Sequence, residues 1–110
     1  MNFKEIFEQY PKAWEKLKFF AGYNIFVKEE KLLYWVEEYK EPYPIHNLYD
    51  FFDSEGIVIE IAFDYDNNTF YSSIEKANGV SLFTSVDCTT RPEAEEAGFI
   101  KAFEILESKL

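Results

Sequence analysis

Residues 89–110 read TTRPEAEEAGFIKAFEILESKL, a stretch whose residue types predict where a helix begins, which face it buries and where it ends. Thr90 and Glu93 fit a capping box, in which the hydroxyl accepts a backbone N–H and the carboxylate reaches back to the cap. Pro92 suits the first turn, where its missing N–H costs nothing. Lys109 complements the negative end of the helix dipole. We therefore expect a long C-terminal helix that starts just after Thr90.

Apolar residues recur along this helix at helical spacing and form one stripe. They are Phe99, Ala102, Phe103, Leu106 and Leu110. A stripe of this kind needs an apolar surface to lie on, and the strands expected before the helix are the nearest candidate. The C-terminal helix should therefore cover one face of a sheet.

Residues 57–86 predict that sheet, a three-stranded antiparallel meander. Between residues 57 and 65, apolar side chains occupy every second position, which is typical of a half-buried strand. These side chains are Ile57, Ile59, Ile61, Phe63 and Tyr65. A turn at residues 66–68 leads into a second strand over 69–75. Asn78 and Gly79 are a strong hairpin signal before a third strand over 80–86.

The N-terminal residues predict two helices. Asn2 and Glu5 repeat the capping pattern at the start of a short helix, and Pro11 interrupts it. The simplest interpretation is a second helix that begins at Pro11 and stops at Gly22, and a single kinked helix is the alternative. The inward residues of the second helix are expected to be Ala13, Trp14, Leu17, Phe20 and Ala21.

The middle of the chain is less regular. Residues 23–41 fit either a strand or a helix, and both interpretations stay open. Asn47 can cap a short helix that contains Leu48, Phe51 and Phe52 and that Gly56 ends. Together these segments predict an α+β fold, with residues 1–110 as a single domain.

Composition narrows the function classes. The chain has 110 residues and a net charge of −10, which argues against direct binding to nucleic acid or to an anionic membrane. We see no apolar run long enough to span a bilayer and no signal-peptide core, so a cytoplasmic location is expected. The lone cysteine, Cys88, cannot form an internal disulfide, which suits a reducing compartment. The charge favours a basic protein partner.

One local pattern resembles a calcium loop. Asp64, Asp66, Asn68 and Glu75 occupy positions 1, 3, 5 and 12 of an EF-hand. Position 6 is Thr69 where the motif needs Gly, and the flanks have strand periodicity where an EF-hand needs helices. Hairpin-turn chemistry explains every residue except Glu75, so we expect a turn, with a weak divalent-ion site as the alternative.

A second signal is an acidic stretch with aromatic neighbours. No Lys or Arg lies between residues 41 and 75, where acidic side chains are frequent. The candidate partner-binding residues are Tyr43, Tyr49, Asp50, Asp53, Glu55 and Glu60. A solvated surface that maintains solubility explains the charge equally simply. The sharper hypothesis is an acidic face that docks on a basic partner, because Tyr is a frequent interface anchor.

The sequence contains no recognisable catalytic motif. His46 and Cys88 are the only residues of their kinds, and nothing else supports a nucleophilic pair or a metal site. We expect no cofactor and a non-enzymatic role, with catalysis by paired carboxylates left open. The remaining alternatives are a ligand- or divalent-ion-binding module or small enzyme that uses residues 64–75, and a self-associating structural protein such as a homodimer.

Two stretches resemble a known group of proteins. They are LYDFFDSEG at residues 48–56 and TRPEAEEAGFIKAFEILE at residues 90–107. Both are similar to small uncharacterised proteins encoded by bacteriophages and mobile elements of gut bacteria. The resemblance implies an accessory protein made during growth of such an element, and it carries over no functional residue. The leading hypothesis is an acidic accessory protein that inhibits a basic, nucleic-acid-handling host protein.

Overall fold

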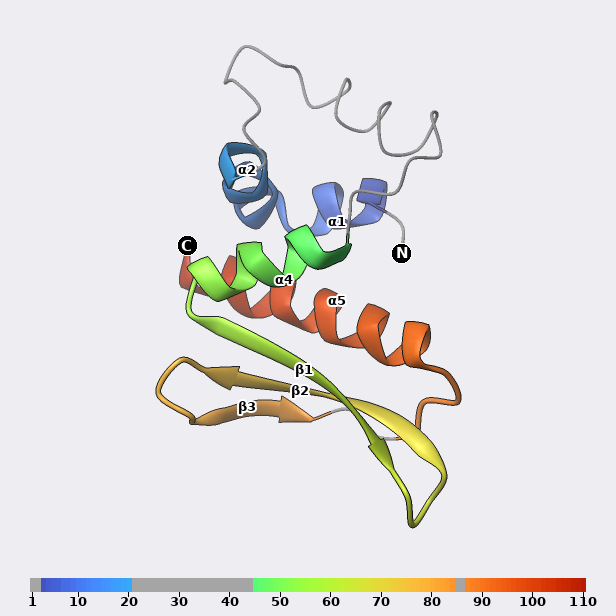
Figure 1. The fold of residues 1–110 in the computed structure, drawn as a ribbon. Coiled ribbons are helices and arrows are strands. Elements are labelled where there is room, and N and C mark those ends of the chain that lie inside the picture. Colours follow the sequence, from blue (N-terminus) through green and yellow to red (C-terminus); the bar gives the residue numbers. More distant parts are fainter. Residues whose placement is uncertain (1–2, 21–44, 85–86) are drawn as a thin grey trace.

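The computed structural model describes residues 3–20, 45–84 and 87–110 (Figure 1). In chain order the helices and strands are α1 (Phe3–Gln9), α2 (Pro11–Phe20), α4 (Ile45–Ser54), β1 (Ile57–Asp64), β2 (Thr69–Lys76), β3 (Ser81–Thr84) and α5 (Arg91–Lys109). The expected α+β class is confirmed. Residues 23–41, for which the sequence fits either a strand or a helix, lie outside the described residues.

The sheet is the predicted antiparallel meander, with strand order β1-β2-β3. The Asp64 carboxylate accepts the backbone N–H groups of Asp66 (3.0 Å) and Asn67 (3.3 Å) and so closes the first turn. At the second turn Gly79 has a φ of +87°, a conformation that favours glycine. The N–H of Lys76 then donates to the carbonyl of Val80 at 2.8 Å. Both hairpins therefore follow from turn residues.

The two faces of the sheet differ. We call one the helix-covered face, because α5 and α4 lie on it, with α1 and α2 beyond them (Figure 1). Among the described segments no helix lies on the opposite, open face. The core fills the space between the helix-covered face and helices α4 and α5, and it continues between these helices and α1 and α2. Its largest buried side chains are Trp14, Phe51, Phe52, Phe99, Phe103, Leu17, Leu48, Ile57, Ile74 and Leu106.

Helix α5 crosses the sheet at Gly98. A Cβ atom on Gly98 would lie 3.0 Å from the Cβ of Ser72 and 3.3 Å from Cγ2 of Ile59. Real Cβ contacts are rarely this short, so the missing side chain allows the helix to approach the strands closely. Nothing in the local helix pattern required glycine at this position.

The start of α5 matches the prediction with one change. Thr90 is the N-cap, and its hydroxyl accepts the N–H of Glu93 at 3.3 Å. The Glu93 carboxylate, however, accepts the backbone N–H of Thr89 (3.0 Å) and its hydroxyl (2.8 Å), one residue before the cap. The box is therefore closed through Thr89, because the carboxylate reaches past the cap to a site with two donors.

The N-terminal residues form two separate helices, as the simpler interpretation predicted. Tyr10 lies between them and donates its N–H to the carbonyl of Ile6 at 2.8 Å. The N–H groups in the first turn of α2, which have no partner within the helix, donate hydrogen bonds to a residue far along the chain. The Glu107 carboxylate of α5 accepts the N–H of Lys12 (3.2 Å) and of Ala13 (2.7 Å). A tertiary contact thus caps α2.

Several predicted positions need correction. Tyr65 lies just beyond β1 and is 87% exposed, and Phe20 is 42% exposed although its ring approaches that of Phe51 at 5.5 Å. Leu110 follows the end of α5 and is 43% exposed. Asn47 lies inside α4 and does not cap it. Tyr65, Phe20 and Leu110 lie at or beyond the end of the strand or helix to which periodicity assigned them. Asn47 does not cap α4 because this helix begins two residues earlier, at Ile45.

Candidate functional site

Among the described side chains of helix α4, one set is fully buried and another is exposed. Leu48, Phe51 and Phe52 are fully buried, and Asp50 and Asp53 are exposed. The buried set meets the core aromatics of α5. Phe52 makes an edge-to-face contact with Phe103 at 4.9 Å, and its ring stacks on Phe99 at 6.3 Å. Packing on one side of α4 therefore fixes the direction in which its two aspartates point.

The position of these aspartates works against the helix itself. Asp50 and Asp53 lie in the C-terminal half of α4, which has no basic residue in its last turn. The C-terminus of a helix carries partial negative charge, so acidic side chains there are unfavourable by a few tenths to about 1 kcal/mol. The fold gains nothing from their charge.

The chain passes directly from α4 into β1. Gly56 has a φ of +76° and donates its N–H to the carbonyl of Asp53 at 3.0 Å. Glu55, in this turn, is half-buried. The tight turn places β1 directly after α4, and the two elements pack against each other.

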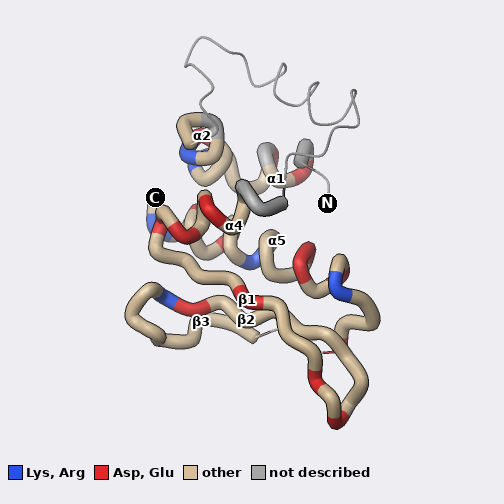
Figure 2. Tube along the Cα trace, in the orientation of Figure 1, with Lys and Arg blue, Asp and Glu red and all other residues tan. Residues whose placement is uncertain are grey.

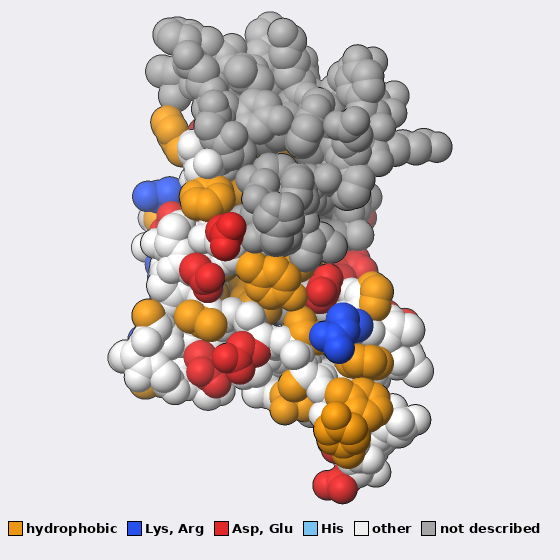
Figure 3. Space-filling model, viewed as in Figure 1, with side chains coloured by type: hydrophobic (Ala, Val, Ile, Leu, Met, Phe, Trp, Pro, Cys, Tyr) orange, Lys and Arg blue, Asp and Glu red, His pale blue; other side chains and the backbone are white. Residues whose placement is uncertain are grey.

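Glu60 and Glu75 occupy the open face of the sheet together. In the β1–β2 register Glu60 is opposite Ser73 and Glu75 is opposite Val58, so the two carboxylates are diagonal neighbours on one face. We call Asp50, Asp53, Glu60 and Glu75 the acidic surface. Figure 2 shows acidic positions along α4, β1 and β2, and in Figure 3 acidic side chains over α4 and over the sheet are visible from one side.

Tyr49 is held in the structure and is not a free anchor. It is half-buried, and its ring meets Phe99 edge-on at 5.0 Å. Burial, followed by the charge and hydrogen bond of Glu95, raises the pKa of Tyr49 to about 12, although Arg91 acts in the opposite direction. Tyr43, the other candidate tyrosine, lies outside the described residues.

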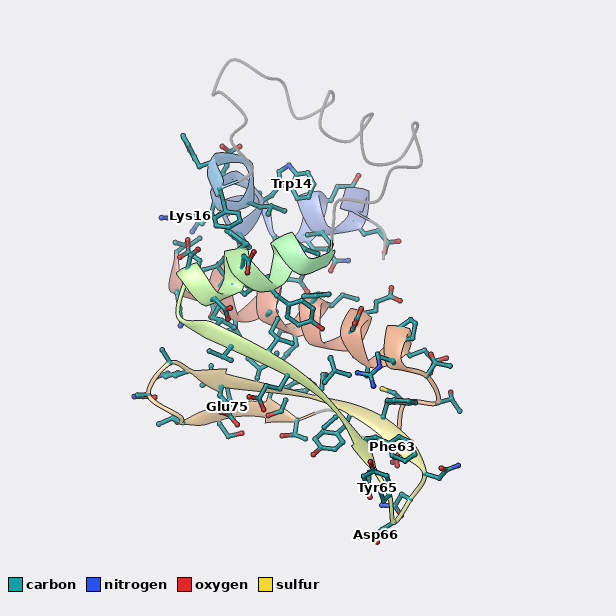
Figure 4. The ribbon with its side chains drawn as sticks, viewed as in Figure 1. Trp14, Lys16, Phe63, Tyr65, Asp66 and Glu75 are labelled. Carbon is teal, nitrogen blue, oxygen red and sulfur yellow. The ribbon has the colours of Figure 1, made fainter. Side chains whose placement is uncertain are left out.

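The structure brings together aromatic residues that the sequence did not single out as a site. Phe63 contacts Tyr65 and Phe70 edge-to-face, with centroid distances of 5.0 Å in both cases. The guanidinium of Arg91 lies 5.3 Å from the centroid of the Phe70 ring. We call Phe63, Tyr65 and Phe70 the aromatic row. The row lies near the exposed tip of the β1–β2 hairpin (Figure 4). The alternation in residues 57–65 is the available signal, but it predicts only a half-buried strand and does not indicate a separate aromatic cluster.

The calcium-loop candidates do not converge. Asp64 is opposite Thr69 at the tip of the hairpin, whereas Glu75 is opposite Val58 near its other end (Figure 4). The Asp64 carboxylate also accepts Nδ2 of Asn67 at 2.8 Å, and the hydrogen bonds from Asn67 and Asp66 lower its pKa. Within the described ranges, no group of three or more His, Cys, Asp or Glu side chains has an arrangement that could hold a metal ion.

Cys88 is half-buried and extends the sheet by one bridge. Its backbone exchanges two hydrogen bonds with Phe70, at 2.8 and 3.1 Å. The side chain of His46 lies outside the described residues, so the structure does not address the Cys–His pairing that residue counts allowed.

Comparison with known proteins adds no identification: the chain matches no family model, no curated protein and no solved structure. The helices in residues 3–20, 45–84 and 87–110 are all too short or too polar to traverse a bilayer.

Proposed function

We propose that this protein is a non-enzymatic binding protein that uses its acidic surface to dock on a basic protein partner. The concrete version is an accessory protein of a phage or mobile element that occupies a nucleic-acid-handling host protein. Such a host protein presents lysine and arginine where it binds phosphate, and these groups would meet the carboxylates of the acidic surface.

The observation that carries the proposal is the placement of Asp50 and Asp53. Both are exposed in the C-terminal half of α4, and Asp53 lies in the last turn, where the helix dipole opposes negative charge; α4 itself is held by its buried aromatic face. Charged residues that lower the stability of the helix that carries them are often present because the protein's function requires them. Figure 3 shows acidic side chains over α4 and over the sheet on one side of the molecule, which supports a shared partner.

The test is a pull-down with tagged protein from a lysate of the natural host, washed at low and then at high salt and identified by mass spectrometry. A basic protein that stays bound at low salt and dissociates at high salt is expected, because exposed charges are screened within about 10 Å at 0.1 M salt. The variant Asp50→Lys/Asp53→Lys/Glu60→Lys should lose that protein.

A matched variant controls for net charge. Glu8→Lys/Asp66→Lys/Glu104→Lys changes the same number of exposed acids away from the acidic surface. It should retain the partner, and circular dichroism should show that both variants are folded. Equal capture by wild type and by the Asp50, Asp53 and Glu60 variant would overturn the proposal.

A further inference from the structure

The two edges of the sheet are unequal. Strand β3 is four residues long, and within the described residues its pairing with β2 is interrupted by a bulge after Ile74, so that edge is irregular. Strand β1 is eight residues long and keeps a continuous register with β2. In the described part of the chain no strand lies on the outer side of β1. A long, regular outer strand is a template for pairing with another chain.

The hydrogen bonds identify which groups of β1 point outward. Ala77 donates its N–H to Gly56 at 3.2 Å, and alternate positions from there, such as Glu60, bond to β2 in the antiparallel pattern. On the other side of β2, Phe70 exchanges both its bonds with Cys88, which is consistent with this alternation. The outward N–H and C=O groups of β1 are therefore those of Ile57, Ile59, Ile61 and Phe63. None of these groups is hydrogen-bonded to a described segment.

The side chains beside this edge have opposite character on the two faces. On the helix-covered face Ile61 and Phe63 are half-buried, so each has apolar surface left to cover. On the open face Glu60 is exposed and Glu75 is its diagonal neighbour. A strand laid beside β1 would meet apolar groups with one set of side chains and carboxylates with the other.

We propose that the outer edge of β1 receives an extended segment of the basic partner as a fourth strand. The matching segment alternates apolar residues with lysine or arginine, because successive side chains of a strand point to opposite faces. This inference rests on the proposed function and names its mode of binding. A second copy of this chain is the less suitable occupant, because antiparallel pairing of two β1 strands would bring like charges together across the junction.

The test uses an eight-residue peptide of four Lys-Val repeats as the probe, matched in length to β1. In the free protein the outward amides of Ile59, Ile61 and Phe63 should exchange with solvent faster than those of Glu60 and Ala62. The alternating peptide should slow the exchange of the three outward amides by about tenfold or more, as measured by NMR. A peptide with the same residues in blocks of lysine and valine should give no such protection.

Two variants locate the binding. Ile61→Pro removes one outward N–H and no ladder bond, as edge positions allow, and should weaken binding of the alternating peptide about tenfold. Glu60→Lys keeps every N–H group and should weaken binding of the lysine peptide while creating binding to a Glu-Val peptide. This charge exchange keeps the proposal testable if Ile61→Pro does not fold.

The outcomes separate this inference from the proposed function. Equal binding of the alternating and block peptides, without amide protection, would overturn strand addition and leave docking by charge in place. Absence of peptide binding would also overturn it. Protection of the outward amides that rises with protein concentration in the absence of peptide, together with a doubled mass in solution, would identify a second copy as the occupant and overturn the assignment to a partner.

Discussion

Helices α5 and α4 pack against each other in the core, yet they differ in how charged residues are placed in their first and last turns. In α5 the N-cap is Thr90, and Glu93 in the first turn and Lys109 in the last turn both agree with the helix dipole, whereas Arg91 in the first turn and Glu107 in the last oppose it. In α4 the first turn has no acidic residue and the last turn no basic one, while Asp50 and Asp53 occupy its C-terminal half.

The two helices nevertheless share one aromatic core. Phe51 and Phe52 of α4 contact Phe103 of α5 at centroid distances of 6.5 and 4.9 Å. Packing energies of several kcal/mol outweigh dipole effects below about 1 kcal/mol. Helix α4 is therefore held by its buried face, which leaves its exposed charges available for another role.

Removing the shared packing should have the largest effect. Phe103→Ala deletes a fully buried ring that contacts Phe51 and Phe52 of α4, and we expect a loss of about 3–5 kcal/mol in the free energy of unfolding. Urea denaturation measures it. Phe19→Ala is the control, since Phe19 is 61% exposed, and should change stability by less than about 0.5 kcal/mol. Similar losses in both variants would contradict a core shared by α4 and α5.

The end of α5 has a second structural task, the cap on α2. Glu107→Ala should destabilise the protein by about 1.5–3 kcal/mol, because two backbone N–H groups lose a charged acceptor. Glu104→Ala, one turn earlier, removes only an exposed pair with Lys101 and should matter by about 0.2–0.5 kcal/mol. Thermal melting compares the two. A Glu107 variant as stable as the Glu104 variant would show that α2 does not need this cap.

The crossing of α5 over the sheet gives a prediction of unusual sign. Gly98→Ala should raise helix propensity by about 1 kcal/mol. The added Cβ would press on Ser72 and Ile59, however, and overpacking of this kind costs about 1–3 kcal/mol. We expect a net loss of about 1 kcal/mol in urea denaturation. Ala97→Gly, at the neighbouring half-buried position, should lose about 1 kcal/mol from propensity alone. A Gly98→Ala protein more stable than the wild type would contradict this expectation and show that Ser72 and Ile59 can move to accommodate the added Cβ.

The capping carboxylate of α5 should make stability depend on pH. The hydroxyl and N–H of Thr89, followed by the backbone of Thr90, lower the pKa of Glu93 below its ordinary value of 4.5. Because the folded pKa is the lower one, the stabilisation is present above pH 4.5 and is lost as the pH falls through the folded pKa. The melting temperature of Glu93→Gln should therefore fall less than that of the wild type when the pH is lowered from about 6 to 3. Glu8→Gln is the control, and an unchanged pH profile for Glu93→Gln would contradict the role of this carboxylate.

The smallest effect tests α4 directly. Asp53→Lys should stabilise the protein by about 0.3–1 kcal/mol, because it replaces an unfavourable charge at the negative end of the helix by a favourable one. The same variant should bind the basic partner more weakly. Lys109→Asp makes the opposite change at the end of α5 and should destabilise by a similar amount without affecting binding. A destabilised Asp53→Lys protein would contradict the dipole argument.

Residues a few positions apart were enough to predict most of the fold. Thr90 reaches the N–H of Glu93, and Asp64 reaches that of Asp66, within one turn of chain. The alternation of apolar and polar residues predicted the strands, because successive side chains of a strand point to opposite faces of the sheet. The exposure of Asp50 and Asp53 was readable in the same way, since Leu48, Phe51 and Phe52 define the opposite face of one helix.

Contacts between segments far apart in the sequence are determined only by the tertiary structure. Glu107 caps α2 from far along the chain, and Gly98 is required only because Ser72 lies beneath it. Tyr49, predicted to be an anchor, is held against Phe99, and Glu75 is separated from Asp64 because an extended strand carries it to the other end of the hairpin. The free edge of β1 likewise depends on the order of strands. Local patterns determine turns, caps and faces, whereas register, helix approach and sheet edges depend on how the whole chain closes on itself.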